Sequence, residues 1–139
     1  MQANYWHKQT KNELLFPDLE WSKPENKMHA GKLVIIGGNL HGFAAPALAF
    51  GEAEKAGIGS VSVVLPSAIQ ETVGGFLPEA VFVPSTPIGS FGSQSLAEML
   101  DSASWGDAVL LAGDFGRNSE TAIVLEKFLD SFTGPVTIT

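Results

Sequence analysis

The sequence of 139 residues contains no cysteine and few basic residues. Without thiols, the chain can form neither a disulfide framework nor a thiolate that would hold a metal or attack a substrate. Eight lysine and arginine residues stand against fifteen acidic residues, which gives a net charge of −7. Because binding to a phosphate backbone needs clustered cations, we expect no nucleic acid as a partner.

Long apolar runs are missing as well. No uninterrupted apolar stretch of about 18 residues occurs, so we expect no membrane-spanning segment and no membrane partner. The first eight residues lack the apolar segment of a secretory signal, which together with the absence of cysteine predicts a cytoplasmic protein. The three histidines, His7, His29 and His41, show no metal-ligand spacing, so no metal site is predicted.

Apolar residues and glycines are plentiful, and they are unevenly placed. Hydrophobic residues make up 45% of the chain and charged residues 17%, which is typical of one folded domain rather than a disordered chain. All fifteen glycines follow residue 30. We therefore predict an N-terminal arm, residues 1–30, and an α/β body, residues 31–139. The arm's Phe16 and Trp21 are expected to pack on the body, and an exposed arm that binds a partner is the alternative.

Beyond residue 31, short β-branched runs alternate with helical patterns. Strands are predicted at 33–36, 60–65, 80–83, 108–111 and 135–139, and helices at 43–56, 67–73, 96–103 and 119–132. Strands that are apolar on both faces and alternate with helices predict a three-layer α/β/α sandwich with a mostly parallel, Rossmann-like sheet. In such sheets, ligands bind at the carboxyl ends of the strands.

Two glycine-rich turns follow predicted strands and lead into helices. The first contains Gly37, Gly38, Asn39 and His41. Glycine allows a ligand to approach the backbone closely, and a helix N-terminus offers unpaired N–H groups to an anion. The alternative is a tight connection that binds nothing, since the spacing matches neither the dinucleotide fingerprint nor the P-loop. His41 can donate to a phosphate or transfer protons, although a surface role at a helix start is the commoner one.

The second turn contains Gly113, Asp114, Gly116 and Arg117. Arg117 is the one arginine of the chain, and a planar guanidinium pairs well with phosphate. Asp114 opposes a phosphate unless a metal intervenes. A surface ion pair with Glu120 is the alternative role of Arg117. The two turns together predict a weak, salt-sensitive site for a nucleotide or a phosphorylated metabolite.

Residues 31–59 run through a strand, Gly-Gly-Asn, Ala-Ala, a helix and Ala-Gly-Ile-Gly, which resembles the start of the NAD(P)H-hydrate dehydratase family in the ribokinase-like, carbohydrate-kinase-related superfamily. A second likeness covers residues 107–121, where Ala-Gly-Asp-Phe-Gly-Arg stands in place of the family's Gly-Pro-Gly-Leu-Gly-Arg. The resemblance extends over residues 31–139. Two departures concern the site: Asp114 brings a carboxylate where the family has bare backbone, and Ala45 alone matches the family's Gly-Ala-Ala.

The resemblance implies an ATP- or ADP-dependent lyase that repairs a hydrated nicotinamide cofactor, or a transferase that phosphorylates a small alcohol. It also implies that Ala45 and the second turn border the substrate. Family members are much longer, and their nucleotide site and catalytic aspartate lie in their second half. We therefore expect an N-terminal half that is inactive alone and forms a homodimer or larger assembly through an open sheet edge. The alternatives are a non-catalytic module that binds a nucleotide or an anionic metabolite, and a purely structural subunit.

Overall fold

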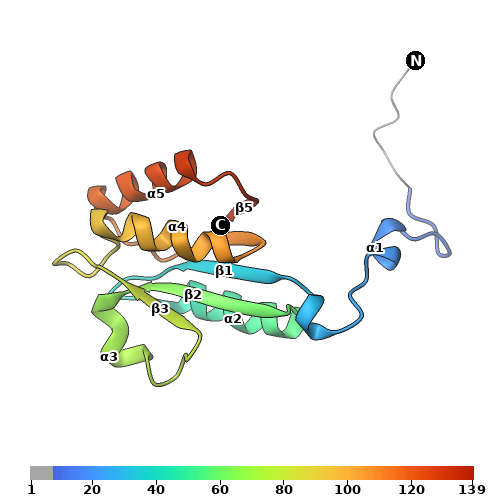
Figure 1. Ribbon diagram of the computed structural model, residues 1–139, viewed down its shortest axis with the longest axis horizontal. Coiled ribbons are helices and arrows are strands. Elements are labelled where there is room, and N and C mark those ends of the chain that lie inside the picture. Colours follow the sequence, from blue (N-terminus) through green and yellow to red (C-terminus); the bar gives the residue numbers. More distant parts are fainter. Residues whose placement is uncertain (1–7) are drawn as a thin grey trace, which may run out of the picture.

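The structure is a computed structural model that describes residues 8–139. Within these residues a five-stranded sheet has the order β3-β2-β1-β4-β5 (Figure 1). Its strands are β1 (Lys32–Gly37), β2 (Ser60–Pro66), β3 (Ala80–Val83), β4 (Ala108–Gly113) and β5 (Val136–Ile138). Every neighbouring pair is parallel. The predicted α/β class with a parallel sheet is confirmed, and β3 and β5 form the two edges.

Helices cover both faces of the sheet. Helices α2 (Ala44–Ala56) and α3 (Gln70–Val73) lie on one face, and α4 (Leu96–Trp105) and α5 (Ser119–Ser131) lie on the other (Figure 1). Single 3-10 turns span Lys27–His29, Ser67–Ile69 and Ser93–Ser95. None of the helices in residues 8–139 combines the length and the apolar character that crossing a bilayer requires. Because helices lie on both faces of the sheet, the three predicted layers are present.

Two apolar cores fill the space between the layers. Side chains alternate along a strand, so Val34 and Ile36 of β1 face one side and Ile35 faces the other. The first pair belongs to the core that contains Phe128 of α5, and Ile35 belongs to the core with Leu65 under α2 and α3. Because β1 is buried on both faces, the glycine turn that follows it starts from a fixed position.

The sequence predicts where α2 ends more accurately than it predicts which side chains of α2 and α5 are buried. Helix α2 ends at Gly57, which has φ 87° and caps the helix as predicted. Leu48 of α2 and Ile123 of α5 are large apolar residues, and both are exposed. The buried positions are Pro46 in α2 and a row in α5 made of Thr121, Val124 and Phe128. A threonine therefore takes an inward position that hydrophobicity alone assigns to an isoleucine.

The arm extends away from the body (Figure 1). It contains the four-residue helix α1 (Asp18–Trp21), and its large apolar side chains are exposed, Trp21 by 92% and Phe16 by 63%. Its last turn meets the body, where Lys27 forms a 3.8 Å ion pair with Glu54 of α2. The expected packing of Phe16 and Trp21 on the body thus does not occur in this structure. Residues 1–7 lie outside the described part of the chain.

Candidate functional site

The two glycine-rich turns meet where the strand order of the sheet reverses. The chain leaves β1 for α2 on one face and leaves β4 for α5 on the other. In open α/β sheets, ligands bind outside the carboxyl ends of the strands at such a point, and this place is called the crevice below. There the N–H of Gly38 donates to the carbonyl oxygen of Gly113 over 3.1 Å. The structure therefore brings together the two turns that the sequence predicts to form one site.

Asn39 links the two turns to each other. Its side-chain amide donates to the main-chain oxygen of Asp114 over 2.5 Å, and its Oδ1 accepts from the N–H of His41 over 2.8 Å. Of the described residues, Asp114 is the one non-glycine with positive φ, at 56°. This left-handed region suits aspartate and asparagine better than other side chains. Asn39 thus stabilises the conformation that sets the direction of the Asp114 side chain.

The carboxylate of Asp114 caps helix α2. Its Oδ2 accepts from the N–H of Ala45 over 2.8 Å, across 69 positions of sequence. The first N–H groups of a helix lack partners within the helix, and an acidic group near them is stabilising. The chain's own carboxylate therefore occupies the position at Ala45 that the sequence offered to a ligand anion. An incoming phosphate must compete with this carboxylate for the helix end.

Arg117 lies exposed beside this crevice, and its expected ion pair is not formed. Glu120 accepts instead from the N–H and the hydroxyl of Ser93, over 2.8 and 2.9 Å. The described ion pairs are Lys27–Glu54 and Lys55–Glu52, both near the C-terminal end of α2. The alternative role of Arg117 is therefore wrong for this structure, and its guanidinium faces solvent.

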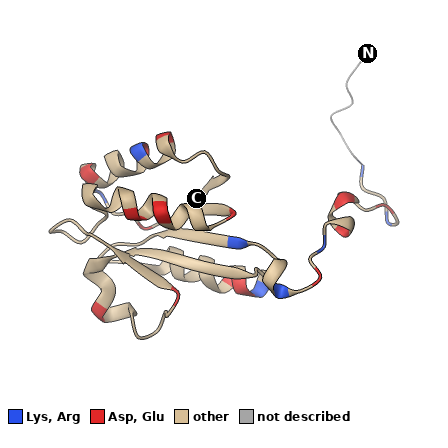
Figure 2. Ribbon diagram, viewed as in Figure 1, with Lys and Arg blue, Asp and Glu red and all other residues tan. Residues whose placement is uncertain are grey.

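Basic residues gather at the opposite end of the sheet. Figure 2 shows basic residues, in blue, at the end of the sheet where β1 begins and α2 ends. Lys32 is the first residue of β1, Lys55 lies in the last turn of α2, and Lys27 forms its ion pair with Glu54 of that turn. The carboxyl ends of the strands lie at the other end, where Arg117 is found. His41 is also exposed, and its main chain rather than its ring forms the bond to Asn39. The N–H groups of residues 38–42 already donate within the protein, so a phosphate at the crevice can use the N–H groups of the second turn and a single cation.

A third loop, residues 84–95, completes the site and was missed from the sequence. Its Gly89 oxygen accepts from the N–H of Leu40 over 2.8 Å. A Cβ added to Gly116 would lie 3.0 Å from the Ser90 hydroxyl, so the loop also touches the second turn. The sequence feature that could have identified this loop is its position directly after the strand at 80–83. The carboxyl ends of parallel strands lie at the same edge of a sheet, so a loop that follows one of them lies near the others. Its richness in proline, serine and glycine had indicated only a loop.

The first turn of α5 fixes this loop in place. The hydroxyl of Thr121 donates to the oxygen of Phe91 over 2.9 Å, and the side-chain amide of Asn118 donates to the Thr86 hydroxyl over 3.3 Å. Asn118 also caps α5 by accepting from the N–H of Glu120. Because Thr86 and Thr121 are buried, these bonds are shielded from water. The crevice therefore has a rigid third wall.

The bonds from Ser93 hold the pKa of the Glu120 carboxyl below its ordinary value. A carboxyl with a lowered pKa in the folded state adds stability above its unfolded pKa, and this contribution is lost as pH falls through the folded-state value. We expect Glu120→Gln to lower the melting temperature at pH 7, and we expect this difference to shrink as the pH falls below about 4.3, the ordinary pKa of a glutamate. Thermal melts between pH 7 and pH 3 measure this, with Glu126→Gln on the same helix as the control. A melting-temperature difference that does not change with pH would contradict the role of the Glu120 charge.

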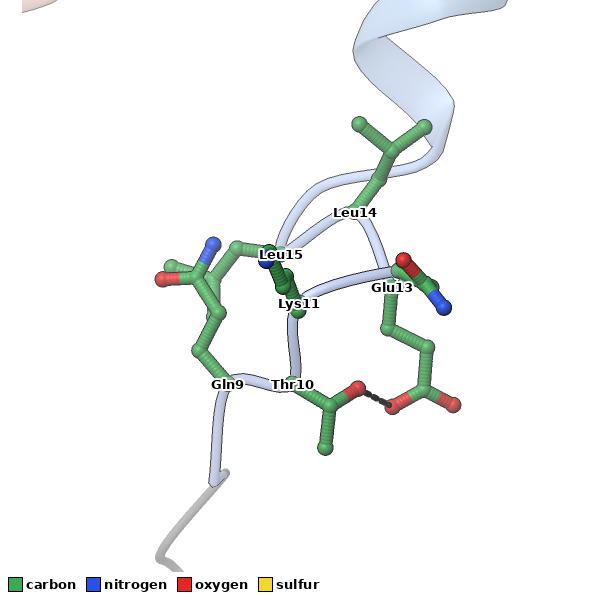
Figure 3. A pocket seen from close by; sticks show the side chains of 7 residues that line it. Gln9, Thr10, Lys11, Glu13, Leu14 and Leu15 are labelled. Atoms are coloured by element: carbon green, nitrogen blue, oxygen red, sulfur yellow. Dashed lines mark hydrogen bonds between the residues drawn. The ribbon is translucent and has the colours of Figure 1, made fainter.

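A second hollow lies within the arm and has no connection with the crevice. Seven consecutive residues, 9–15, line this space of about 550 Å³. Figure 3 shows Thr10 bonded to Glu13, at 3.0 Å, and the Leu14 side chain pointing away from the turn. The hollow is formed by the bend of one continuous segment, and no residue of the body lines it. In residues 8–139 no group of three or more histidine, aspartate or glutamate side chains is arranged to hold a metal.

The fold is similar to that of a solved protein of the ribokinase-like superfamily. A ribokinase-like superfamily protein from Enterococcus faecalis superposes with a TM-score of 0.62 at 19% sequence identity, over 84% of this chain and 39% of that protein. At this identity the likeness concerns the fold alone. No protein-family model matches the chain.

Within that fold, the sequence is similar to enzymes that repair hydrated NAD(P)H. The bifunctional NAD(P)H-hydrate repair enzyme Nnr of Methanothermobacter thermautotrophicus is 33% identical over 97 residues, which cover 70% of this chain and 18% of the enzyme. The enzyme of the same name from Thermanaerovibrio acidaminovorans is 28% identical over 117 residues, covering 82% and 23%. The predicted resemblance to this family is confirmed. The chain spans about a fifth of the length of these relatives.

Proposed function

We propose that this chain is the substrate-binding part of a ribokinase-like enzyme that repairs hydrated NAD(P)H in an ATP- or ADP-dependent reaction. The observation that carries the proposal is the meeting of the two glycine turns at the reversal of the strand order, with Gly38 bonded to Gly113. The similarity to NAD(P)H-hydrate repair enzymes supports the choice of ligand class. The nucleotide that drives the reaction is proposed to bind mainly to residues outside these 139.

The chemistry of the crevice suits a ligand with two kinds of polar group. The exposed Arg117 guanidinium and the N–H groups of the second glycine turn attract a phosphate. The Asp114 carboxylate accepts from donors, so a hydroxyl or a carboxamide N–H fits beside it better than a second phosphate. A hydrated nicotinamide nucleotide carries phosphate, hydroxyl and carboxamide groups. In this proposal the phosphate lies toward Arg117 and the donor groups lie toward Asp114.

We expect the chain alone to bind this ligand without converting it. His41 is the single acid–base candidate of the first turn, and its ring forms no hydrogen bond among the described residues. The test is an assay with hydrated NADH plus ATP or ADP, and with ATP alone. We predict no rate above background. A rate well above background that disappears in His41→Ala and persists in His29→Ala would overturn this expectation.

A non-catalytic module that senses a nucleotide or an anionic metabolite is the second candidate. The observation that favours it is the capping of α2 by Asp114, because a carboxylate there weakens an anion site. The reading frame after Thr139 separates the two candidates. A continuation that encodes a Gly-Asp turn before a helix supports the enzyme, and a stop codon supports the module.

A further inference from the structure

An apolar groove lies between α2 and α3, on the sheet face opposite α4 and α5. Its volume is about 230 Å³, and every residue that lines it is apolar, among them Phe43, Pro46, Phe50 and Phe76. A dry cavity of about 150 Å³ is large enough to bind benzene. The groove therefore has room for one large aromatic side chain.

The rim of this groove exposes apolar surface to water. Phe76, which follows α3 and lines the groove, is 88% exposed, and Ala47 of α2, which also lines it, is exposed. Large apolar patches at a surface mark interaction sites, because leaving them in water is unfavourable. The groove is thus an open acceptor that lacks an occupant among residues 8–139.

The arm supplies side chains of the matching kind. Five large apolar residues are exposed within eight positions of it: Leu14, Leu15, Phe16, Leu19 and Trp21. Trp21 is the most exposed of them, at 92%, and it ends helix α1. In its own chain the arm joins the body at the Lys27–Glu54 ion pair and then points away from the sheet (Figure 1). Its apolar side chains are therefore presented to another molecule.

We propose that two copies of this chain pair by exchanging arms, so that Trp21 of each copy enters the α2–α3 groove of the other. A two-fold arrangement makes every contact twice. One arm in one groove is a small interface, whereas two such contacts together approach the area of about 1,200–2,000 Å² that stable pairs bury. A second copy is thus a better occupant than the chain's own arm, which buries only one contact.

Charge supports the same partner. The arm carries Lys11 and Lys23, whereas the elements beside the groove carry Glu71 and Glu79. None of these four side chains forms an ion pair within residues 8–139. The body holds the whole net charge of −7, whereas the four lysines of the arm are balanced by four acidic residues, so an arriving arm adds no net charge to the acidic body of the other copy. The exchange therefore pairs an almost neutral arm with an acidic body.

Light scattering from 1 to 100 µM protein tests the pairing. We expect a mass that rises from 14.7 kDa toward twice that value, and a dissociation constant at least about tenfold higher in Trp21→Ala, as for an aromatic anchor of an interface. Ile123→Ala on α5 changes another exposed apolar side chain and should leave the dissociation constant unchanged. Since Trp21 is exposed in the single chain, circular dichroism should show the Trp21→Ala variant fully folded.

Cross-linking through introduced cysteines tests which surfaces are in contact. Because the chain contains no cysteine of its own, only the introduced thiols react. A mixture of Ser22→Cys and Ala47→Cys chains, treated with a short bismaleimide, should give a covalent heterodimer, because Ala47 lines the groove and is exposed. A mixture of Ser22→Cys and Ile123→Cys chains should not.

Three results would overturn the proposal. The first is a mass that stays near 14.7 kDa at all concentrations. The second is a dimer that is equally strong in Trp21→Ala, which would favour pairing through the β5 edge. The third is a link between residues 22 and 47 that forms only inside a doubly substituted chain, which would place the arm in its own groove. None of these results affects the proposed ligand site, which lies at the strand ends.

Discussion

Gly37→Ala should lower the free energy of unfolding by about 2–3 kcal/mol. A Cβ added at Gly37 would lie 2.6 Å from the carbonyl oxygen of Gly113. That oxygen is backbone at the end of the neighbouring strand, so it cannot rotate away as a side chain would. The strands β1 and β4 must separate to admit the methyl group, and the bond from Gly38 to Gly113 is lost with them. The effect is large because the change falls between two buried strands.

Gly51→Ala is the matched control, with an effect of opposite sign. A Cβ at Gly51 meets no atom within 4 Å, and the residue lies inside α2. Alanine inside a helix is more stable than glycine by about 0.5–1 kcal/mol. Urea denaturation of both variants measures the two effects. A Gly37→Ala chain as stable as the unsubstituted one would show that β1 and β4 are not held this closely at the crevice.

Asp114→Asn should raise the affinity of the crevice for inorganic phosphate about tenfold. A carboxylate about 4 Å from an anion costs about 4 kcal/mol at a surface dielectric, and solvent at this exposed position reduces the cost to about 1.4 kcal/mol. Asparagine keeps an oxygen that accepts from Ala45, and it tolerates the φ of 56°. The variant therefore removes the negative charge while it keeps the turn.

Phosphate titration followed by the amide signals of Gly38 and Ala45 measures this affinity. Asp107→Asn is the control, because it makes the same charge change at the opposite end of the sheet, where Asp107 accepts from the N–H of Lys32 over 2.9 Å. Its phosphate affinity should equal that of the unsubstituted chain. An equal rise in both variants would show an effect of net charge alone, and no rise in Asp114→Asn would contradict competition at the helix end.

The sequence predicts the strands well, because their patterns are local. Each expected strand overlaps an observed one, and the β-branched run through Val34, Ile35 and Ile36 becomes the buried centre of the sheet. The closure of α2 by Gly57 was also predictable, since a helix C-cap depends on few neighbouring residues. The resemblance of the two glycine turns to one family indicated that they belong to one site.

Contacts between residues that lie far apart in the sequence could not be predicted from local sequence patterns. The sequence shows that Asp114 opposes phosphate, but its bond to Ala45 depends on how β1 and β4 are placed. The burial of Thr121 and the exposure of Ile123 are set by the loop that packs on α5, because the Thr121 hydroxyl bonds to Phe91. Hydrophobicity alone cannot supply this information. The same holds for the arm, whose apolar residues predicted packing and are exposed.

The central claim is that the crevice between β1 and β4 binds an anionic nucleotide. Titration of ¹⁵N-labelled chain with ADP and AMP, followed by NMR, tests it most directly. The account predicts shifts at millimolar ligand in the amides of residues 37–43 and 113–118, and weaker binding at higher salt because one cation supports the site. The absence of a shift in every one of these amides would contradict the account.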